Sequence, residues 1–152
     1  MMKQSMKFAG AIVLIAFMGM AFTAAHKTEK KDKLKYFDGT YEEAIKLAKK
    51  EKKAVFIDAY TSWCGWCKEL DKRTFSNDDV AEYMNANFIN MKIDMESEVG
   101  IPLANKYKVR AFPTLLFIHH EEKVSHRIEG FMQAPAFLEE AKLAKKINDG
   151  EK

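Results

Sequence analysis

The chain contains only two cysteines, Cys64 and Cys67, among its 152 residues. Two cysteines cannot build the network of disulfides that stabilises many small secreted domains. They also leave a tetrahedral zinc site short of ligands, and the four histidines do not have the paired helical spacing that would supply the rest. We therefore expect no bound metal.

The chain also has no large excess of charge, since 25 basic and 22 acidic residues give a formal net charge of +3. This balance implies neither nucleic acid nor an anionic membrane as a partner. The sequence contains no internal repeat and no low-complexity segment. Its length suits one domain around one core.

Residues 1–25 have the pattern of a secretory signal peptide. Lys3 and Lys7 precede an apolar run from Phe8 to Phe22, and small residues follow at the expected cleavage site. The run of about fifteen residues is shorter than the roughly 20 that a membrane-spanning helix needs. We expect cleavage and a periplasmic or secreted protein, with a retained membrane anchor as the alternative.

The rest of the chain divides into three parts. Residues 26–33 form a charged linker of mixed sign, residues 34–148 form the folded domain, and residues 149–152 form a C-terminal tail. Removing residues 1–25 takes away two lysines and no acid, so the net charge falls by two.

The hydrophobic pattern of the domain predicts strands and helices in alternation. The strands are expected at residues 34–37, 54–57, 88–94, 114–119 and 124–129. Helices are expected at residues 40–51, 65–75, 76–87 and 101–107, and from Pro135 onward. This order predicts an α/β fold with a mixed central sheet and helices on both of its faces.

Both cysteines lie in the stretch Trp63-Cys64-Gly65-Trp66-Cys67-Lys68, where an apolar run gives way to a helical pattern. A thiolate at the first turn of a helix is stabilised by free backbone N–H groups and the helix dipole. Cys67, three residues later, lies on the same face and can attack a disulfide formed at Cys64. The pattern favours a redox-active dithiol over a purely structural disulfide, because so short a loop removes little unfolded-state entropy.

The chain resembles the thioredoxin superfamily over residues 34–148. Its cysteine motif differs from that of thioredoxin only at Trp66, where thioredoxin has proline. Asp58 stands where thioredoxins keep a buried acid, Phe112-Pro113-Thr114 matches their cis-proline segment, and Gly130 matches their late glycine. The segment from Arg73 to Val80 is more similar to the periplasmic C-terminal domain of the bacterial thiol:disulfide interchange reductase.

The resemblance implies a thioredoxin fold and a role for each matching residue. Cys64 would be the attacking nucleophile, Cys67 the resolving thiol and Asp58 the proton acceptor. The residues expected to bind substrate are Trp63, Gly65, Trp66, Phe112 and Pro113. The Cys64–Cys67 disulfide would be the redox group, with no other cofactor.

The function implied is that of an exported oxidoreductase that reduces protein disulfides and is itself kept reduced by a membrane electron-donor protein. Two alternatives remain open. One is an oxidase or isomerase that introduces or rearranges disulfides. The other is a redox-linked module that binds a partner through Trp63 and Trp66.

The chain departs from the thioredoxin pattern at two positions. Asn90, four residues before Asp94, replaces a lysine that influences the buried acid in thioredoxin. Trp66 removes the proline constraint from the first helical turn, and we expect Trp66 to be more exposed than Trp63. Neither the oligomeric state nor the effect of these changes on the reduction potential follows from the sequence.

Overall fold

The protein is described here by a computed structural model that defines residues 33–150 of the 152. A four-stranded sheet in the order β2-β1-β3-β4 forms its centre. The strands are β1 (Ala54–Tyr60), β2 (Phe88–Asp94), β3 (Thr114–Ile118) and β4 (Val124–Glu129). β2 runs parallel to β1, whereas β3 is antiparallel to β1 and to β4. The sheet is therefore mixed, as the sequence predicts.

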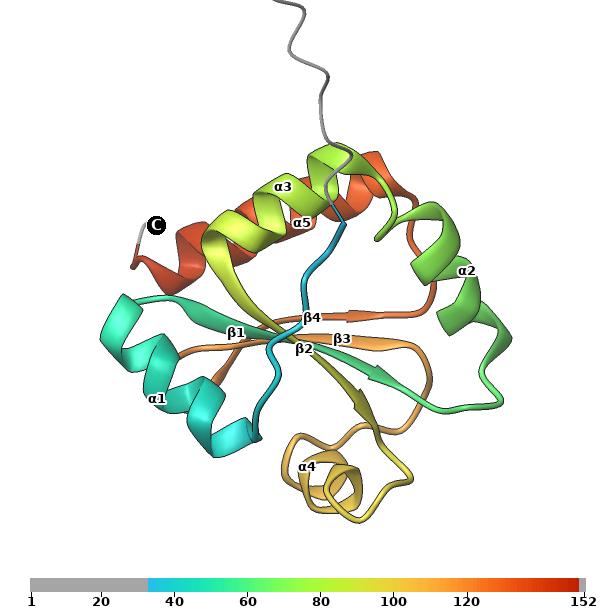
Figure 1. The fold of residues 1–152 in the computed structure, drawn as a ribbon, viewed down its shortest axis with the longest axis horizontal. Coiled ribbons are helices and arrows are strands. Elements are labelled where there is room, and N and C mark those ends of the chain that lie inside the picture. The colour runs from blue at the N-terminus through green and yellow to red at the C-terminus, as the bar shows by residue number, and fades with distance from the viewer. Residues whose placement is uncertain (1–32, 151–152) are drawn as a thin grey trace, which may run out of the picture.

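Helices cover both faces of this sheet, which also confirms the prediction (Figure 1). They are α1 (Tyr41–Glu51), α2 (Gly65–Arg73), α3 (Asp78–Asn87), α4 (Gly100–Lys106) and α5 (Ala134–Asn148). α1 and α4 lie on one face, and α2, α3 and α5 lie on the other (Figure 1). Across residues 33–150 no helix combines the length and apolar character needed to cross a membrane. The predicted signal peptide, most of the linker and the last two residues lie outside the described residues.

Each face of the sheet has its own hydrophobic core, because successive side chains of a strand point to opposite faces. The core under α1 and α4 is mainly aliphatic and includes Val55 and Ile57. The core under α2, α3 and α5 is rich in aromatic rings, with Phe56 in contact with Phe117 and Phe137. β1 is buried along nearly its whole length, as its continuous apolar run indicates.

Two helix starts show how local sequence sets the boundaries. Thr40 and Glu43 form the predicted capping box at α1. The predicted start of α3 at Ser76 is wrong by one residue, since Asn77 is the N-cap and accepts from the Val80 N–H at 3.2 Å. The Ser76 hydroxyl instead donates to a carbonyl of the preceding helix, so it is not available as a cap.

The strand predicted at residues 34–37 is absent, and these residues form an irregular segment that we call the N-terminal strap (residues 33–37). The Phe37 N–H donates to the Asn90 carbonyl at 2.7 Å, and the Asn90 amide donates to the Lys35 carbonyl at 3.3 Å. The Asn85 side chain accepts from the Lys35 N–H at 2.9 Å. Because side chains supply most of these bonds, the strap covers the edge of β2 without forming a ladder.

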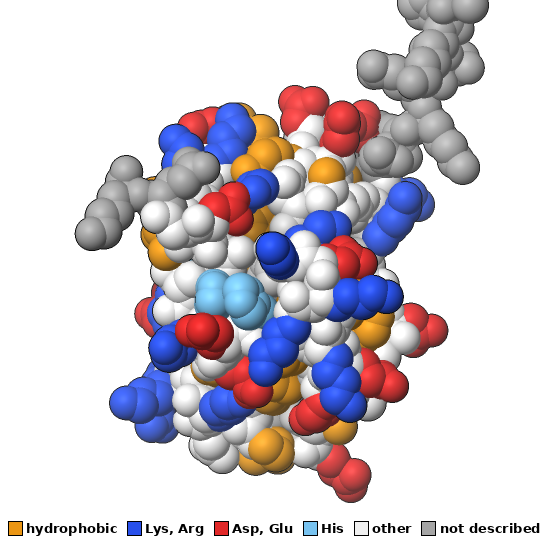
Figure 2. All heavy atoms as spheres, turned by 90° about the vertical axis from the view of Figure 1, so that its left-hand side faces the viewer, with side chains coloured by type: hydrophobic (Ala, Val, Ile, Leu, Met, Phe, Trp, Pro, Cys, Tyr) orange, Lys and Arg blue, Asp and Glu red, His pale blue; other side chains and the backbone are white. Residues whose placement is uncertain are grey.

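The end of the molecule that carries α1 faces the viewer in Figure 2, where basic and acidic side chains are interspersed around pale blue histidines. Hydrophobic side chains on the visible part of this face lie in small separate groups. His119 and His120 follow β3 with ring centroids 3.9 Å apart. No group of three or more metal-binding side chains occurs within residues 33–150.

Candidate functional site

The site begins where β1 ends and the chain turns into α2. Cys64 is the N-cap of α2, and its sulfur accepts a hydrogen bond from the Cys67 N–H at 3.1 Å. A disulfide joins Cys64 to Cys67. The two cysteines are 4% and 2% exposed, respectively, so the disulfide lies just beneath the surface.

The electrostatics of α2 favour a negative charge on Cys64 when the disulfide is reduced. The first turn of the helix contains no acidic residue, and its last turn carries Lys72 and Arg73. Free N–H groups and the positive end of the helix dipole therefore face the Cys64 sulfur without a competing carboxylate in that turn. This environment lowers the free energy of a thiolate relative to the thiol.

Two exposed tryptophans lie at the disulfide, Trp63 just before Cys64 and Trp66 between the two cysteines, and each contacts a phenylalanine from another part of the chain. Trp63 packs edge-on against Phe112 with ring centroids 5.9 Å apart, and Trp66 packs against Phe131 at 5.6 Å. Trp63 is 65% exposed and Trp66 is 60% exposed. The expectation that Trp66 is the more exposed residue is therefore wrong.

The two aromatic pairs are held differently. The Trp63 indole N–H donates to the Glu96 carboxylate at 3.0 Å. Near the other pair, the Arg73 guanidinium lies 5.8 Å from the centre of the Phe131 ring. The Thr74 hydroxyl donates to the Met132 carbonyl at 2.6 Å and so holds the segment containing Phe131 beside the end of α2.

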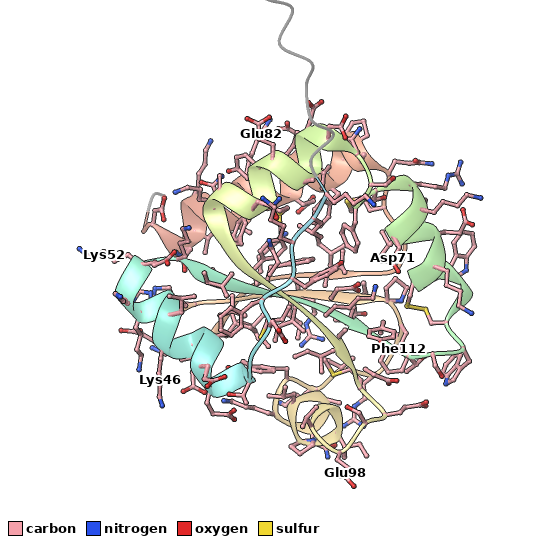
Figure 3. The ribbon with its side chains drawn as sticks, in the orientation of Figure 1. Lys46, Lys52, Asp71, Glu82, Glu98 and Phe112 are labelled. Carbon is pink, nitrogen blue, oxygen red and sulfur yellow. A yellow bond between two sulfur atoms is a disulfide. The ribbon has the colours of Figure 1, made fainter. Side chains whose placement is uncertain are left out.

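The Phe112–Pro113 peptide bond is cis, as expected from the resemblance. It immediately precedes β3, and the Pro113 carbonyl accepts from the Gly130 N–H at 2.9 Å. Gly130 adopts a φ of 88°, a left-handed conformation that suits glycine. The contact between Phe112 and Trp63 places this segment beside the cysteine motif (Figure 3).

Asp58 lies on the face of β1 that is covered by α2, and it is fully buried. Its Oδ2 accepts from the Lys92 ammonium at 2.7 Å, whereas within residues 33–150 its buried Oδ1 has no hydrogen-bond partner. Burial raises the pKa of Asp58 from 3.8 to about 6, although Lys92 acts in the opposite direction. A carboxyl group with this pKa changes its protonation state near neutral pH.

The sequence places the loss of thioredoxin's lysine at Asn90, but Asp58 has a lysine partner all the same, Lys92. In the parallel pairing of β1 with β2, Asp58 lies opposite Lys92, whereas Asn90 lies opposite Phe56 and binds the N-terminal strap. The comparison by distance from Asp94 led to the wrong residue. The alternation of side chains along β2 could have identified Lys92. It lies on the same face of the strand as Asn90 and two residues nearer the strand end.

Phe131, Glu96 and Asp71 are three further residues of this region that the sequence did not single out. Phe131 and Glu96 contact the tryptophans, and Asp71 binds the Lys92 ammonium at 2.6 Å. Phe131 follows the matching Gly130 directly, which was a usable signal. The positions of Glu96 and Asp71 depend on how loops and helices pack, and periodicity does not report that.

Comparison with known structures identifies the fold that carries this site. A thioredoxin from Thermus thermophilus matches with a TM-score of 0.65 at 23% identity, over 72% of this chain and 85% of its own. The chain therefore has the thioredoxin fold.

A more specific match follows from the sequence. The family model Thioredox_DsbH, described as a protein of unknown function (DUF255), matches residues 21–112. This range is more than half of the chain, and the chain belongs to this family.

Two relatives are similar over most of this chain. The thiol:disulfide interchange protein DsbD of Pseudoalteromonas atlantica is 33% identical over 106 residues, which are 67% of this chain but 18% of that protein. The chain thus spans less than a fifth of the length of that curated relative. A Bacteroides thetaiotaomicron protein, provisionally described as a disulphide-isomerase, is 40% identical with a TM-score of 0.66, over 81% of this chain and 99% of its own.

Proposed function

We propose that this protein is a thiol:disulfide oxidoreductase that reduces disulfides in other proteins through Cys64 and Cys67. The observation that carries the proposal is the Cys64–Cys67 disulfide at the N-terminus of α2, with Cys64 at the cap position. Purely structural disulfides do not need a helix N-terminus that stabilises a thiolate. The similarity to DsbD, a protein named for thiol:disulfide interchange, supports the same reaction.

In the proposed reaction the dithiol form attacks a disulfide in a client protein. The Cys64 thiolate forms a bond to one client sulfur, and the other client sulfur leaves as a thiolate. Cys67 then loses its proton to Asp58 and attacks the Cys64 sulfur, which releases the second client thiolate. Two electrons pass to the client, whose thiolates take up protons from solvent, and the Cys64–Cys67 disulfide forms.

We assign the nucleophile role to Cys64 because of its position. Its sulfur already accepts the Cys67 N–H, and a thiolate there faces the open end of the helix. Gly65 is exposed, and a Cβ at that position would meet no atom of the rest of the chain within 4 Å. The absence of a side chain at Gly65 therefore leaves the approach to the disulfide open.

The substrate surface in this proposal consists of the aromatic pairs and the cis-proline segment. Trp63 with Phe112, and Trp66 with Phe131, present apolar area beside a buried disulfide. An extended client segment that contacts these rings would bring its sulfur to Cys64. Pro113 shapes the groove in which the client backbone would lie.

We further propose that the protein is exported through residues 1–25 and accepts electrons from a membrane protein. The reducing direction rests on the resemblance of the segment from Arg73 to Val80 to the periplasmic C-terminal domain of the bacterial thiol:disulfide interchange reductase. Isomerisation is the second candidate, because the Bacteroides relative is described as a disulphide-isomerase. Both reactions use the same dithiol, and a reduction potential near about −180 mV, as in protein disulfide isomerase, would favour isomerisation.

The nucleophile assignment is tested by replacing each cysteine singly with serine. Cys64→Ser should abolish the reduction of insulin disulfides, because no thiol remains at the helix cap. Cys67→Ser should retain the first step and accumulate mixed disulfides with clients. Full activity in Cys64→Ser protein would show that the assignment is wrong.

The direction is tested by the equilibrium reduction potential of the Cys64–Cys67 pair, measured against glutathione or a dithiol buffer. A value near roughly −270 mV, as in thioredoxin, supports a reductase. A value near about −120 mV would indicate an oxidant and contradict the reducing direction.

A further inference from the structure

Glu96 holds an exposed tryptophan at the edge of the disulfide. Its Oε2 accepts the Trp63 indole N–H at 3.0 Å, and Trp63 directly precedes Cys64 in the chain. Glu96 is itself exposed, and no lysine or arginine among residues 33–150 forms an ion pair with it. A carboxylate has about four acceptor positions on its two oxygens, so the bond from Trp63 leaves most of them free.

The loop between β2 and α4 fixes the position of this carboxylate. The Glu96 N–H donates to the Asp94 side chain at 3.0 Å, and the Ser97 hydroxyl donates to the Asp94 carbonyl at 2.6 Å. Met95 is buried, and its N–H donates to the Tyr60 carbonyl at the end of β1 at 2.9 Å. A group that binds Glu96 therefore does not have to order the loop first, which lowers the entropic cost of binding.

Two features of this edge attract a positive charge. Trp63 is 65% exposed, and the face of an indole ring attracts ammonium and guanidinium groups. Phe112 supports the Trp63 ring edge-on, with ring centroids 5.9 Å apart, and leaves most of it uncovered. The Glu96 carboxylate beside the indole N–H attracts the same cations and can accept their hydrogen bonds.

The second aromatic pair has a neighbour of opposite charge. The Arg73 guanidinium lies 5.8 Å from the centre of the Phe131 ring, which contacts Trp66. Among the described residues, the ion-pair partner of Arg73 is Glu69, at 3.5 Å, and the last turn of α2 contains a second basic residue. A cation of a client protein is therefore favoured beside Trp63 and not beside Trp66.

We infer that Trp63 and Glu96 form a subsite for a positively charged side chain of the client, which we call the cation subsite. The inference rests on the proposed function and specifies its substrate class, namely disulfide-bonded segments with a lysine or arginine near the cysteine that Cys64 attacks. The cation lies against the indole and donates to the carboxylate. The steps of thiol–disulfide exchange are unchanged, and the subsite acts on how well the client binds and how fast it reaches Cys64.

The kinetic test uses the reduced protein and short peptides that each contain one cysteine in a mixed disulfide with a coloured thiol. Attack on the peptide sulfur releases the coloured thiolate, and its absorbance gives the second-order rate constant. The peptides carry lysine, glutamine or glutamate one or two residues before or after the cysteine. A small uncharged disulfide without a peptide reports on the chemistry alone.

The variants separate the charge of Glu96 from its hydrogen bond. Glu96→Gln removes the charge but keeps an oxygen that accepts the Trp63 N–H, and Glu96→Lys reverses the charge. Glu98→Gln is the matched control, because it removes the same charge from an exposed residue of the same loop. Figure 3 shows Glu98 pointing away from Phe112.

We expect the unchanged protein to reduce the best-placed lysine peptide about fivefold faster than its glutamine counterpart, which is the size of one exposed ion pair. The glutamate peptide should react more slowly still. Glu96→Gln should remove most of this preference, Glu96→Lys should invert it, and Glu98→Gln should retain it. The small uncharged disulfide should react at the same rate with all of these proteins.

A binding measurement tests the subsite without any reaction. Oxidised protein, whose cysteines are joined, is titrated with the same peptides in which serine replaces cysteine, and the NMR signals of the two indole N–H groups are followed. Trp66→Phe identifies the signal of Trp63. The lysine peptide should bind most tightly and shift the Trp63 signal, and added salt should weaken this binding.

Equal rates for the lysine and glutamate peptides, or a preference that survives Glu96→Gln, would overturn the inference. An equal loss in Glu98→Gln would also overturn it, because the preference would then come from the charge of the whole loop. Failure of the proposed function is recognised separately, since Cys64→Ser protein would retain insulin-reducing activity. The titration of oxidised protein decides on the cation subsite in that case as well.

Discussion

On one face of β1, Val55, Ile57 and Ala59 pack into the aliphatic core under α1 and α4, and on the other face Phe56 is followed by Asp58 under α2. The first face contains no charge along β1, whereas the second carries a buried carboxylate on the same side of the sheet as the aromatic core. Burying a charged group lowers stability unless it is paired, and here Lys92 pairs one oxygen only. The first face thus stabilises the fold, and the second gives up stability to keep an acid beside the helix that holds the disulfide.

The largest effect should come from the aromatic core on the same face of the sheet as this acid. Phe56→Ala removes ring contacts with Phe75, Phe117 and Phe137 and should lower the free energy of unfolding by about 4 kcal/mol. Denaturant unfolding measures the loss. Ile57→Ala on the aliphatic face, which also truncates a buried side chain to its Cβ and is expected to lower it by about 3 kcal/mol, is the matched control. Equal losses would contradict the view that the aromatic core contributes more packing energy than the aliphatic core.

Replacing Asp58, in contrast, should raise the free energy of unfolding at neutral and higher pH. Its pKa is raised on folding from 3.8 to about 6, so the folded state binds the proton more tightly than the unfolded state. The free energy of unfolding should therefore fall as the pH rises between these two values and remain lower above pH 6. Asp58→Asn removes this loss and should stabilise the protein by about 3 kcal/mol at pH 8.

The same substitution should slow disulfide exchange, because it removes the proton acceptor. Unfolding curves at pH 4 and pH 8 test the stability change, which should be much smaller at pH 4. A destabilised Asp58→Asn protein at pH 8 would show that the ion pair with Lys92 outweighs the burial of the carboxylate.

The smallest effect is expected at the N-cap of α1, which covers the aliphatic core. Thr40→Ala removes the N-cap of α1 and should lower the free energy of unfolding by about 1 kcal/mol. Because α1 covers the face of the sheet away from Asp58, the pH dependence of disulfide exchange should not change. Thr40→Ser, which keeps the capping hydroxyl, is the control. A changed pH profile in Thr40→Ala would mean that the two faces are coupled.

Much of this architecture could be predicted from local patterns. The continuous apolar run of β1, the alternation in β2 and the hairpin of β3 and β4 each specify a strand through burial of side chains. The cysteine motif specifies a helix start, and the structure places Cys64 at that N-cap. These predictions succeed because the determining residues are neighbours in sequence.

The predictions that failed depend on residues distant in sequence. The segment at residues 34–37 has strand-like composition, but Asn85 and Asn90 bind its backbone with their side chains and prevent a ladder. The partner of Asp58 depends on the register between β1 and β2, which brings Lys92 opposite it. Similarly, the exposure of Trp63 depends on two separate loops, which supply Glu96 and Phe112 as contacts and still leave most of the indole uncovered.

The N-terminal strap has a practical consequence for anyone who shortens or fuses this protein. A version that begins at Thr40 would keep every helix and strand but would remove the strap from the edge of β2, leaving the Asn90 carbonyl without its bond from Phe37. An uncovered strand edge can pair with a second chain, so such a version should self-associate. It would also lose Tyr36 from beside Lys92. A fusion partner should therefore be attached before residue 33, so that the strap stays on the edge of β2 and Tyr36 stays beside Lys92.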